Sequence, residues 1–435
     1  MTPAPDRQAW LLGFGIDAPE TGRTGDVHVL HVIGWAVGRD AQARTLEILE
    51  QERIVRVAPI RGRRRDVAAA FGIAPETECA FEALVTLPGL RLRTTLTLRI
   101  ELEDGSRVDA GTIALDREPL RSGYEPRLAP LMVTTLGRSG STWLMQILAA
   151  HPEVVVFRRF PYESAPAKYW THALRLASES ANPVQSADVE DFHASLWWIG
   201  ANPFHDERLY AQPPLGTWFA GRHVEQLAAF AQRTIDDWYG TLARVQDQPR
   251  ATYFAEKHMW PGYLPVLTWE LYPRAKEIFL VRDFRDMTRS IMAFDEKRGY
   301  PGFGRPEGAS DEEYLRGELR QMVDSLRRSW AERRDRACLV RYEDLARRPA
   351  ETVTSMLEYL EVDSAPGAVE SVLAHGAEQI LSLPGSSHEP TEVAVHRTAG
   401  GLDESIDRWR REVDESFASA ADEVFGEALA EFGYE

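Results

Sequence analysis

Cysteine is almost absent from this chain. Of its 435 residues only two are cysteines, Cys79 and Cys338, and they lie in separate regions of the sequence. Isolated cysteines form neither a metal-ligand motif nor a disulfide framework. This sparse usage suits a reducing compartment, and it leaves the fold to be stabilised by hydrophobic packing.

Long hydrophobic runs are also missing. No run approaches the roughly 20 apolar residues that span a bilayer. The N-terminal residues 1–6 lack the basic and apolar blocks of a signal peptide. We therefore expect a soluble, cytoplasmic protein with no integral membrane association.

Positive charge is in deficit as well. The chain carries 67 acidic against 50 basic residues, which gives a formal net charge of -17. This balance argues against a protein that wraps a nucleic acid, because that role needs an extended basic surface. Small anionic ligands remain compatible with the composition, since a few local cations suffice to bind them.

Core-forming residues, by contrast, are plentiful. Hydrophobic residues make up 44% of the chain and aromatic residues 10%, which excludes a wholly disordered protein. A length of 435 residues exceeds what one hydrophobic core usually serves. We therefore expect two domains, or one large domain with an appended module.

The first 120 or so residues have the pattern of strands and turns. Residues 96–102 alternate between apolar and polar, and the Asp104-Gly105 pair that follows is a strong hairpin signal before the alternation resumes at Val108. The arginine-rich residues 61–65 suit a solvated loop or a sheet edge. We predict a small antiparallel β-sandwich over residues 1–122.

A charged stretch broken by Pro and Gly, residues 116–126, is the candidate linker. Beyond it short apolar runs alternate with helical patterns, which predicts an α/β domain over residues 123–435, a parallel sheet flanked by helices. The predicted strands are at 131–136, 154–157, 278–281 and 337–340, and the predicted helices include 142–150 and 312–334.

The turn between the first of these strands and its helix is rich in small residues. Such a turn presents unpaired backbone N–H groups at the positive end of a helix dipole, where phosphate groups bind well. It is not the G-x-x-x-x-G-K-[ST] loop of nucleoside triphosphatases, because the first glycine is missing and Arg138 precedes Gly140 where a lysine should follow it.

This loop resembles the 5′-phosphosulfate-binding loop of sulfotransferases that use 3′-phosphoadenosine-5′-phosphosulfate (PAPS) and release PAP. Cytosolic members usually have a lysine at the position of Arg138. In having an arginine there, this loop resembles the loops of the tyrosylprotein and bacterial branches. The resemblance implies a PAPS-binding set, with Trp143 at the adenine-stacking position of cytosolic members: Gly137, Arg138, Ser139, Gly140, Ser141, Thr142 and Trp143. Trp143 could equally serve only to pack the helix on the sheet.

A second stretch, residues 278–290, resembles the 3′-phosphate-binding element of the same family, with Arg282 and Ser290 at its two ligand positions. Arg282 would end a strand, and Ser290 would lie about two turns into the next helix. Guanidinium and hydroxyl could then bind one phosphate together. Either motif alone could have only a structural role. Both occur here in the same order along the chain as in the family, which favours a PAPS site.

Three weaker features follow the family order. Residues 256–258, Glu-Lys-His, resemble the segment that carries a sulfate-contacting lysine, here Lys257. Residues 341–345 resemble a common strand-to-helix corner. Residues 396–398 and 405–409 resemble the C-terminal region of bacterial members, which adds Arg397 to the cofactor-binding candidates. The resemblance covers about residues 128–435.

Sulfuryl transfer needs a donor held for in-line attack, stabilised charge on the departing oxygen, and a base for the acceptor hydroxyl. The resemblance assigns the charge stabilisation to Arg138 and Lys257, and it requires no metal. Cytosolic members place a histidine base at the position of Met259. His258 could replace it only with a shift by one residue.

The tyrosylprotein branch uses as its base a glutamate in the segment after the loop helix. Counted from Arg138, the equivalent position in this chain is Arg159. Glu163 is the nearest carboxylate. We favour Glu163 over His258, because a carboxylate in a Pro- and Tyr-lined pocket could have its pKa raised toward the working range. A plain ion pair with Arg158 or Arg159 is the alternative.

The aromatic-rich residues 162–239 fall where this family builds its acceptor pocket. We expect a hydroxyl-bearing acceptor, such as a saccharide, a glycoconjugate or another small molecule. Two rival functions stay open: a kinase that uses a similar loop for ATP, and an inactive protein that binds a nucleotide or a glycan. The pattern does not indicate an oligomeric state.

Overall fold

The computed structural model describes residues 7–22, 28–178, 212–258, 263–378, 398 and 401–434. These residues divide into two structural units. The first comprises residues 1–125, 169–234 and 263–273, and the second comprises residues 126–168, 235–262 and 274–435. We describe each unit by itself.

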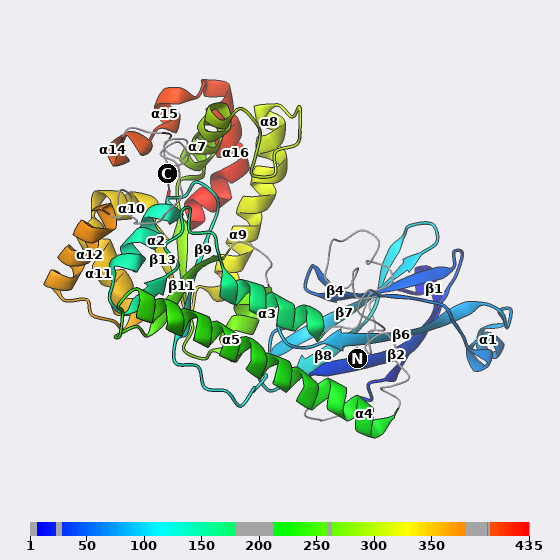
Figure 1. The fold of residues 1–435 in the computed structure, drawn as a ribbon. Helices are drawn as coiled ribbons and strands as arrows, with labels where there is room; N and C mark the ends of the chain where they lie inside the picture. The colour runs from blue at the N-terminus through cyan, green and yellow to red at the C-terminus, as the bar shows by residue number, and fades with distance from the viewer. Residues whose placement is uncertain are drawn as a thin grey trace. The chain divides into compact units, whose positions relative to one another are not determined.

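Two antiparallel sheets of four strands each form the framework of the first unit (Figure 1). One sheet has the order β1-β2-β6-β5 and the other β4-β3-β7-β8. Their strands are β1 Leu11–Ala18, β2 Val29–Gly38, β3 Ala43–Glu50, β4 Arg53–Pro59, β5 Gly62–Arg63, β6 Glu78–Thr86, β7 Arg93–Leu102 and β8 Arg107–Asp116.

The predicted hairpin is confirmed, because β7 pairs antiparallel with β8 and Leu96 lies opposite Ile113. The arginine-rich stretch forms the short edge strand β5. Buried residues from both sheets, such as Val32 of β2 and Leu46 of β3, belong to one hydrophobic cluster. The helical segments η1 Arg7–Ala9, α1 Arg65–Phe71, α4 Pro213–Trp218, η5 Phe219–His223 and α6 Tyr263–Leu271 complete this unit.

The second unit is built on a parallel sheet of five strands in the order β10-β11-β9-β12-β13. The chain thus reverses direction across the sheet at the central strand β9, the topological position at which α/β proteins bind ligands. The strands are β9 Ala129–Thr135, β10 Val154–Val156, β11 Tyr253–His258, β12 Lys276–Val281 and β13 Ala337–Arg341.

Helices cover both faces of this sheet, as predicted (Figure 1). One face packs on α2 Ser141–Ala150, α10 Tyr342–Arg347, α11 Pro349–Leu360 and α12 Pro366–Glu378. The other face packs on α7 Phe284–Arg298, α8 Asp311–Tyr314, the π-helix η6 Leu315–Leu319, α9 Arg320–Arg333 and α16 Glu415–Glu431. The short helices α14 Leu402–Ser405 and α15 Trp409–Glu412 precede α16.

Helices α3 Pro166–Ala177 and α5 Val224–Val245 contribute residues to both units. Among the described residues, no helix has both the length and the apolar character required to cross a bilayer.

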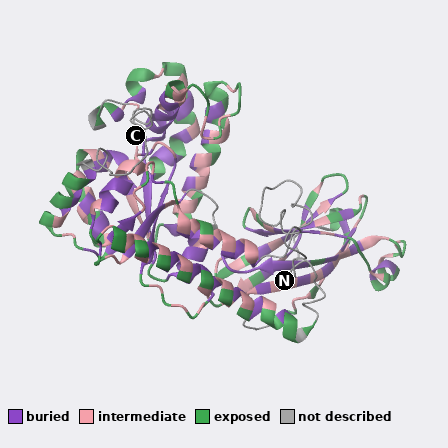
Figure 2. Cartoon of the chain, viewed as in Figure 1, coloured by how far each residue is buried: buried purple, intermediate pink, exposed green. Residues whose placement is uncertain are grey.

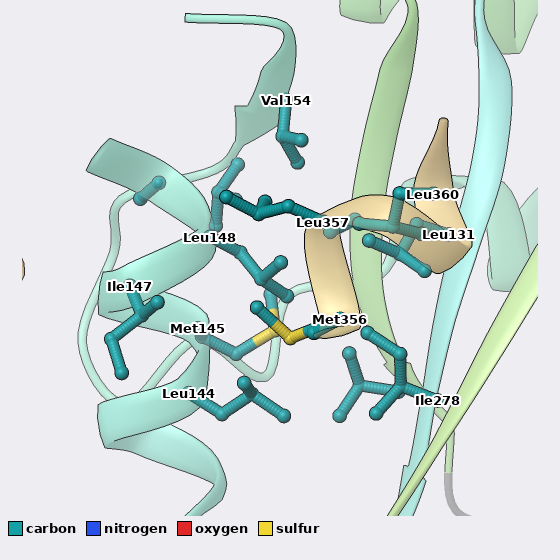
Figure 3. Packing of buried hydrophobic residues seen from close by; sticks show 14 of the residues in the cluster. Leu131, Leu144, Met145, Ile147, Leu148, Val154, Ile278, Met356, Leu357 and Leu360 are labelled. Atoms are coloured by element: carbon teal, nitrogen blue, oxygen red, sulfur yellow. The ribbon is translucent and has the colours of Figure 1, made fainter. Parts of the chain in front are cut away.

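Buried strands line the interior of each unit (Figure 2). In the second unit, Leu144, Met145 and Leu148 of α2 meet Met356 and Leu357 of α11 above the sheet (Figure 3). Leu148 and Leu357 are fully buried. This contact fixes the helix that begins at the phosphate-binding loop candidate.

Leu357→Ala therefore lowers the free energy of unfolding by about 2–5 kcal/mol, because it leaves a cavity between α11, α2 and the sheet. The exposed Ser355 on the same helix is the control, and Ser355→Ala changes that free energy by no more than about 0.5 kcal/mol. Chemical denaturation measures both. Equal effects of the two substitutions would contradict this packing.

Candidate functional site

The loop between β9 and α2 has an unusual backbone. Arg138 has a φ of 66° and Gly140 a φ of 87°, so two alternate residues lie in the left-handed region. A Cβ atom on Gly137 would lie 2.3 Å from the ring of Phe303, and one on Gly140 would lie 2.3 Å from the ring of Tyr342. Both positions therefore favour glycine, because an aromatic ring lies against each of them.

Gly140 is the residue that precedes α2, and no side chain caps this helix end. The first N–H groups of α2 have no intrahelical partners, and the helix dipole is positive there. With the left-handed residues before it, this backbone has the form of an anion-binding loop.

The sheet brings the other candidates to the same edge. β9 lies between β11 and β12, and all three strands run parallel. The carboxyl end of β9 leads into the loop, the end of β11 carries Lys257, and Arg282 directly follows β12. Three separate stretches of the sequence therefore meet because neighbouring parallel strands end together.

Arg282 is buried and contacts the loop directly. Its Nη1 donates to the carbonyl of Arg138 at 3.0 Å and its Nη2 to the carbonyl of Ser405 at 2.5 Å, while its guanidinium lies 4.8 Å from the ring centre of Tyr342. Its buried Nε has no hydrogen-bond partner among the residues that the structure describes. A buried donor of this kind indicates a missing acceptor.

Ser290 lies on α7, where the spacing predicted a helix. Its Oγ accepts from Nε of Arg138 at 3.2 Å and lies 3.2 Å from Oγ1 of Thr398. Nη2 of Arg138 also donates to that Thr398 hydroxyl at 3.2 Å. The structure thus brings the loop, Arg282 and Ser290 into one contact network.

Positive charge is concentrated in this network. Burial and, to a lesser extent, the nearby charges of Arg282 and Arg408 together lower the pKa of Arg138 to about 10. Arg408 is buried as well, and its Nε donates to Glu412 at 2.6 Å. Guanidinium groups held this close repel one another, so a bound polyanion would relieve the repulsion.

Lys257 is the next cation along the edge. Its side chain is 8% exposed, and its Nζ donates to the carbonyl of Pro161 at 2.5 Å and lies 3.9 Å from Oε1 of Glu163. Burial lowers the pKa of Lys257 to about 8; Glu163 opposes this shift, and Arg138 adds to it. An ammonium with this pKa is still mostly protonated at pH 7.

The two candidates for a general base differ in position. Glu163 lies beside Lys257, but its side chain is 64% exposed, so the expectation of an apolar pocket around it was wrong. His258 follows Lys257 in β11 and therefore points to the opposite face of the sheet, where its Nε2 lies 3.7 Å from Glu256. Of the two, only Glu163 is in ion-pair range of Lys257.

Trp143 lies on α2, partly buried, with its ring edge-on to Tyr342 at 6.1 Å between centres. It packs against the hydrophobic cluster between α2 and the sheet. The packing role is therefore observed, and the adenine role stays a prediction. Arg397 and Met259 lie outside the described residues.

Several residues of the network lie in segments that resemble the family but were not predicted as site residues: Thr398, Tyr342, Glu343, Asp286, Ser405 and Arg408. Glu343 accepts from the backbone N–H of Asp283 at 3.0 Å, next to Arg282. Asp286 accepts from the N–H of Trp409 at 2.8 Å, and burial raises its pKa to about 6. Tyr342 and Glu343 lie in the predicted strand-to-helix corner, but their contacts depend on the tertiary fold.

Within the described part of the chain, no three His, Cys, Asp or Glu side chains are grouped so that they could hold a metal ion.

A family model described as "Sulfotransferase family" matches residues 130–366. No curated protein sequence matches the chain.

Solved structures that match the chain include a mouse sulfotransferase complexed with PAP, at 14% identity and a TM-score of 0.40, covering 71% of this chain and 87% of that one. A sulfotransferase domain from a Synechococcus olefin synthase has 20% identity and a TM-score of 0.36, covering 72% and 97%. A sulfotransferase from Alicyclobacillus acidocaldarius has 14% identity and a TM-score of 0.34, covering 72% and 97%.

The buried ammonium of Lys257 makes a prediction about pH. Its pKa of about 8 in the folded protein lies below its ordinary value of 10.5, so the unfolded chain binds more protons between these values. Burial of the charged ammonium therefore lowers the free energy of unfolding by its full amount below pH 8. This loss of stability decreases as the pH rises from 8 to 10.5.

We therefore expect Lys257→Met to melt at a higher temperature than the wild type at pH 7, with the difference shrinking as the pH rises toward 10. Thermal denaturation at a series of pH values measures it. A difference that does not change with pH would show that Lys257 is not desolvated.

Proposed function

The chain belongs to the sulfotransferase family, and we propose that it transfers the sulfuryl group of PAPS to an acceptor hydroxyl. The observation that supports this most strongly is the convergence of the loop, Lys257 and Arg282 at the carboxyl ends of three neighbouring strands. The three elements contain the residues that carried the family resemblance. Their meeting in the fold is a constraint that the sequence motifs did not contain.

The residues present fit PAPS. Its 5′-phosphosulfate would be held by the backbone of residues 137–142 and the hydroxyls of Ser141 and Thr142, at an uncapped helix end. Its 3′-phosphate would be held by Arg282 and Ser290, with Arg397 as a further cation. The orphaned Nε of Arg282 supports this assignment, and Trp143 is the candidate for the adenine.

When bound, PAPS supplies a sulfuryl group activated by a phosphate leaving group. Arg138 and Lys257 would stabilise the negative charge that develops on the bridging oxygen and on the sulfuryl oxygens. Both are buried, so their charges act with little screening by water. A dianionic ligand would also favour the protonated form of Lys257, the form that can donate to an oxygen.

Glu163 is our proposed general base. Its carboxylate lies 3.9 Å from Nζ of Lys257, so a proton acceptor and a sulfuryl-stabilising cation are side by side. An acceptor hydroxyl placed between Glu163 and the sulfuryl group could lose its proton to Glu163 as it attacks. His258 remains the second candidate, although it lies on the other face of the sheet.

The finer assignments are also proposals. We propose a saccharide, a glycoconjugate or another small hydroxyl compound as the acceptor, and no metal requirement. We further propose a β-sandwich accessory domain at residues 1–122, a catalytic domain at residues 123–435 and a cytoplasmic location.

Substitutions separate binding from chemistry. Arg138→Ala and Arg282→Ala each weaken PAP binding by about tenfold to a hundredfold, because each removes charged hydrogen bonds to a phosphate. The exposed Arg328 of α9 is the control, and Arg328→Ala leaves the affinity unchanged. Isothermal titration calorimetry measures all three. Unchanged affinity in Arg282→Ala would remove it from the 3′-phosphate site.

Glu163→Gln keeps PAP binding and lowers turnover by about a hundredfold or more, as expected for the loss of a general base. The check is the rate of PAP formation from PAPS with a panel of hydroxyl acceptors. Normal turnover in this variant would pass the role to His258.

A comparison of donors tests the reaction class. Because the lysine of a nucleoside triphosphate loop is missing, PAPS binds more tightly than ATP, and Mg²⁺ is not needed. Calorimetry with both nucleotides, with and without Mg²⁺, decides this. Tighter binding of ATP would favour a kinase, and PAPS binding without transfer to any acceptor would favour an inactive binding protein.

A further inference from the structure

Lys257 and Glu163 depend on a short segment of backbone, residues 161–168, which we call the crossing segment. It lies between β10, which ends at Val156, and α3, and it includes the first turn of that helix. At the beginning of the segment, the carbonyl of Pro161 accepts a hydrogen bond from the ammonium of Lys257. Glu163 follows two residues later. Whatever holds this segment in place therefore sets the position of both groups.

The other end of the crossing segment is held by Glu256. Its Oε1 accepts from the backbone N–H of Ala167 at 2.7 Å, and its Oε2 accepts from the N–H of Lys168 at 3.0 Å. These N–H groups belong to the first turn of α3, which has no intrahelical acceptors for them. The carboxylate thus satisfies two donors at the positive end of a helix dipole.

Glu256 is itself deeply buried and has further partners. Its side chain is 1% exposed, with His258 at 3.7 Å, and Tyr239 of α5 donates its hydroxyl to Oε1. Tyr239 is fully buried and stacks on Phe254 of β11, with ring centres 4.0 Å apart. A buried carboxylate with three donors arranged around it is rigidly oriented.

Glu256 and Lys257 are neighbours in β11 and point to opposite faces of the sheet. Glu256 accepts hydrogen bonds from the end of the crossing segment, at Ala167 and Lys168. Lys257 donates one to its beginning, at Pro161. The segment therefore passes over the carboxyl end of β11 with both of its ends tied to that strand. Glu163 lies between the two ties.

We propose that Glu256 is a positioning residue for sulfuryl transfer, which holds the crossing segment so that Glu163 and Lys257 face the reacting groups. This proposal rests on the proposed function, because it assigns Glu256 a role through Glu163. Glu256 does not contact the phosphate loop, Arg282 or Ser290 in any hydrogen bond of the structure's described residues. Its loss should therefore affect chemistry and spare nucleotide binding.

Glu277 provides a matched control. It is as buried as Glu256, it lies on the same sheet face, and both residues register with Met132 of the strand between them. Its carboxylate accepts from Thr134 at 2.5 Å and lies 3.5 Å from Arg333. No contact of Glu277 among the described residues reaches the crossing segment.

The test compares Glu256→Gln with Glu277→Gln in the full chain. A glutamine at 256 keeps one acceptor oxygen and turns an NH₂ group toward a backbone N–H, so one donor of α3 loses its partner. Hydrogen exchange of the peptide covering residues 161–168 should rise at least tenfold in Glu256→Gln, and it should stay at the wild-type rate in Glu277→Gln.

Activity gives the second readout. The probe is PAPS with water as the acceptor, followed as release of labelled sulfate, so that no acceptor needs to be known. In Glu256→Gln we expect kcat to fall by about tenfold to a hundredfold, as for a misplaced catalytic group. KM for PAPS and the affinity for PAP should stay within twofold of the wild type. Glu277→Gln should keep the wild-type kcat.

Unchanged exchange of the crossing segment in Glu256→Gln, or equal losses of kcat in both variants, would overturn the proposal. A wild-type protein that neither binds PAP nor consumes PAPS would instead overturn the proposed function. In that case the exchange measurement still decides whether Glu256 holds the segment.

Discussion

The burial of several cations at one edge of a parallel sheet is the constraint on which the site depends. Arg138, Arg282 and Arg408 are largely removed from water, and the charges of the other two lower the pKa of Arg138. Backbone carbonyls partly compensate, since Arg282 donates to those of Arg138 and Ser405. Such an arrangement costs folding free energy unless a polyanion is bound.

The fold tolerates this cost because packing fixes the loop from several sides. Phe303 and Tyr342 leave room only for glycine at positions 137 and 140, and α2 packs in one hydrophobic cluster with α11, α12 and the sheet (Figure 3). On the far side of β11, Glu256 ties α3 to the strand that carries Lys257. The site is therefore held by rigid elements, which is what preorganised charge stabilisation requires.

Local sequence signals predicted the elements well, because each has a short-range cause. The alternation of residues 96–102 with Asp104-Gly105 predicted the β7–β8 hairpin, and the apolar runs predicted β9, β10, β12 and β13. The spacing of Arg282 and Ser290 predicted a strand end and a helix, and both are observed. The meeting of these residues with the loop follows from strand order, which the sequence pattern does not contain.

The residues that escaped prediction act through long-range contacts. Thr398 and Arg408 lie in C-terminal segments that resemble the family, but they are far from the loop in sequence, and the pattern does not show that they contact it. Glu256 was given no role from the sequence; strand alternation turns it to the face opposite Lys257, where it caps α3. The apolar pocket predicted around Glu163 is not formed, because the Glu163 side chain is 64% exposed.

The central claim is that Arg282 and Ser290 bind the 3′-phosphate of the nucleotide, beside a loop that binds its 5′-phosphate. It is tested most directly by the affinities of PAP and adenosine 5′-monophosphate, which differ only in the 3′-phosphate, for the wild type and for Arg282→Ala. The account predicts that the wild type binds PAP at least about tenfold more tightly and that Arg282→Ala loses most of this preference. Equal affinities of the wild type for the two nucleotides would contradict it.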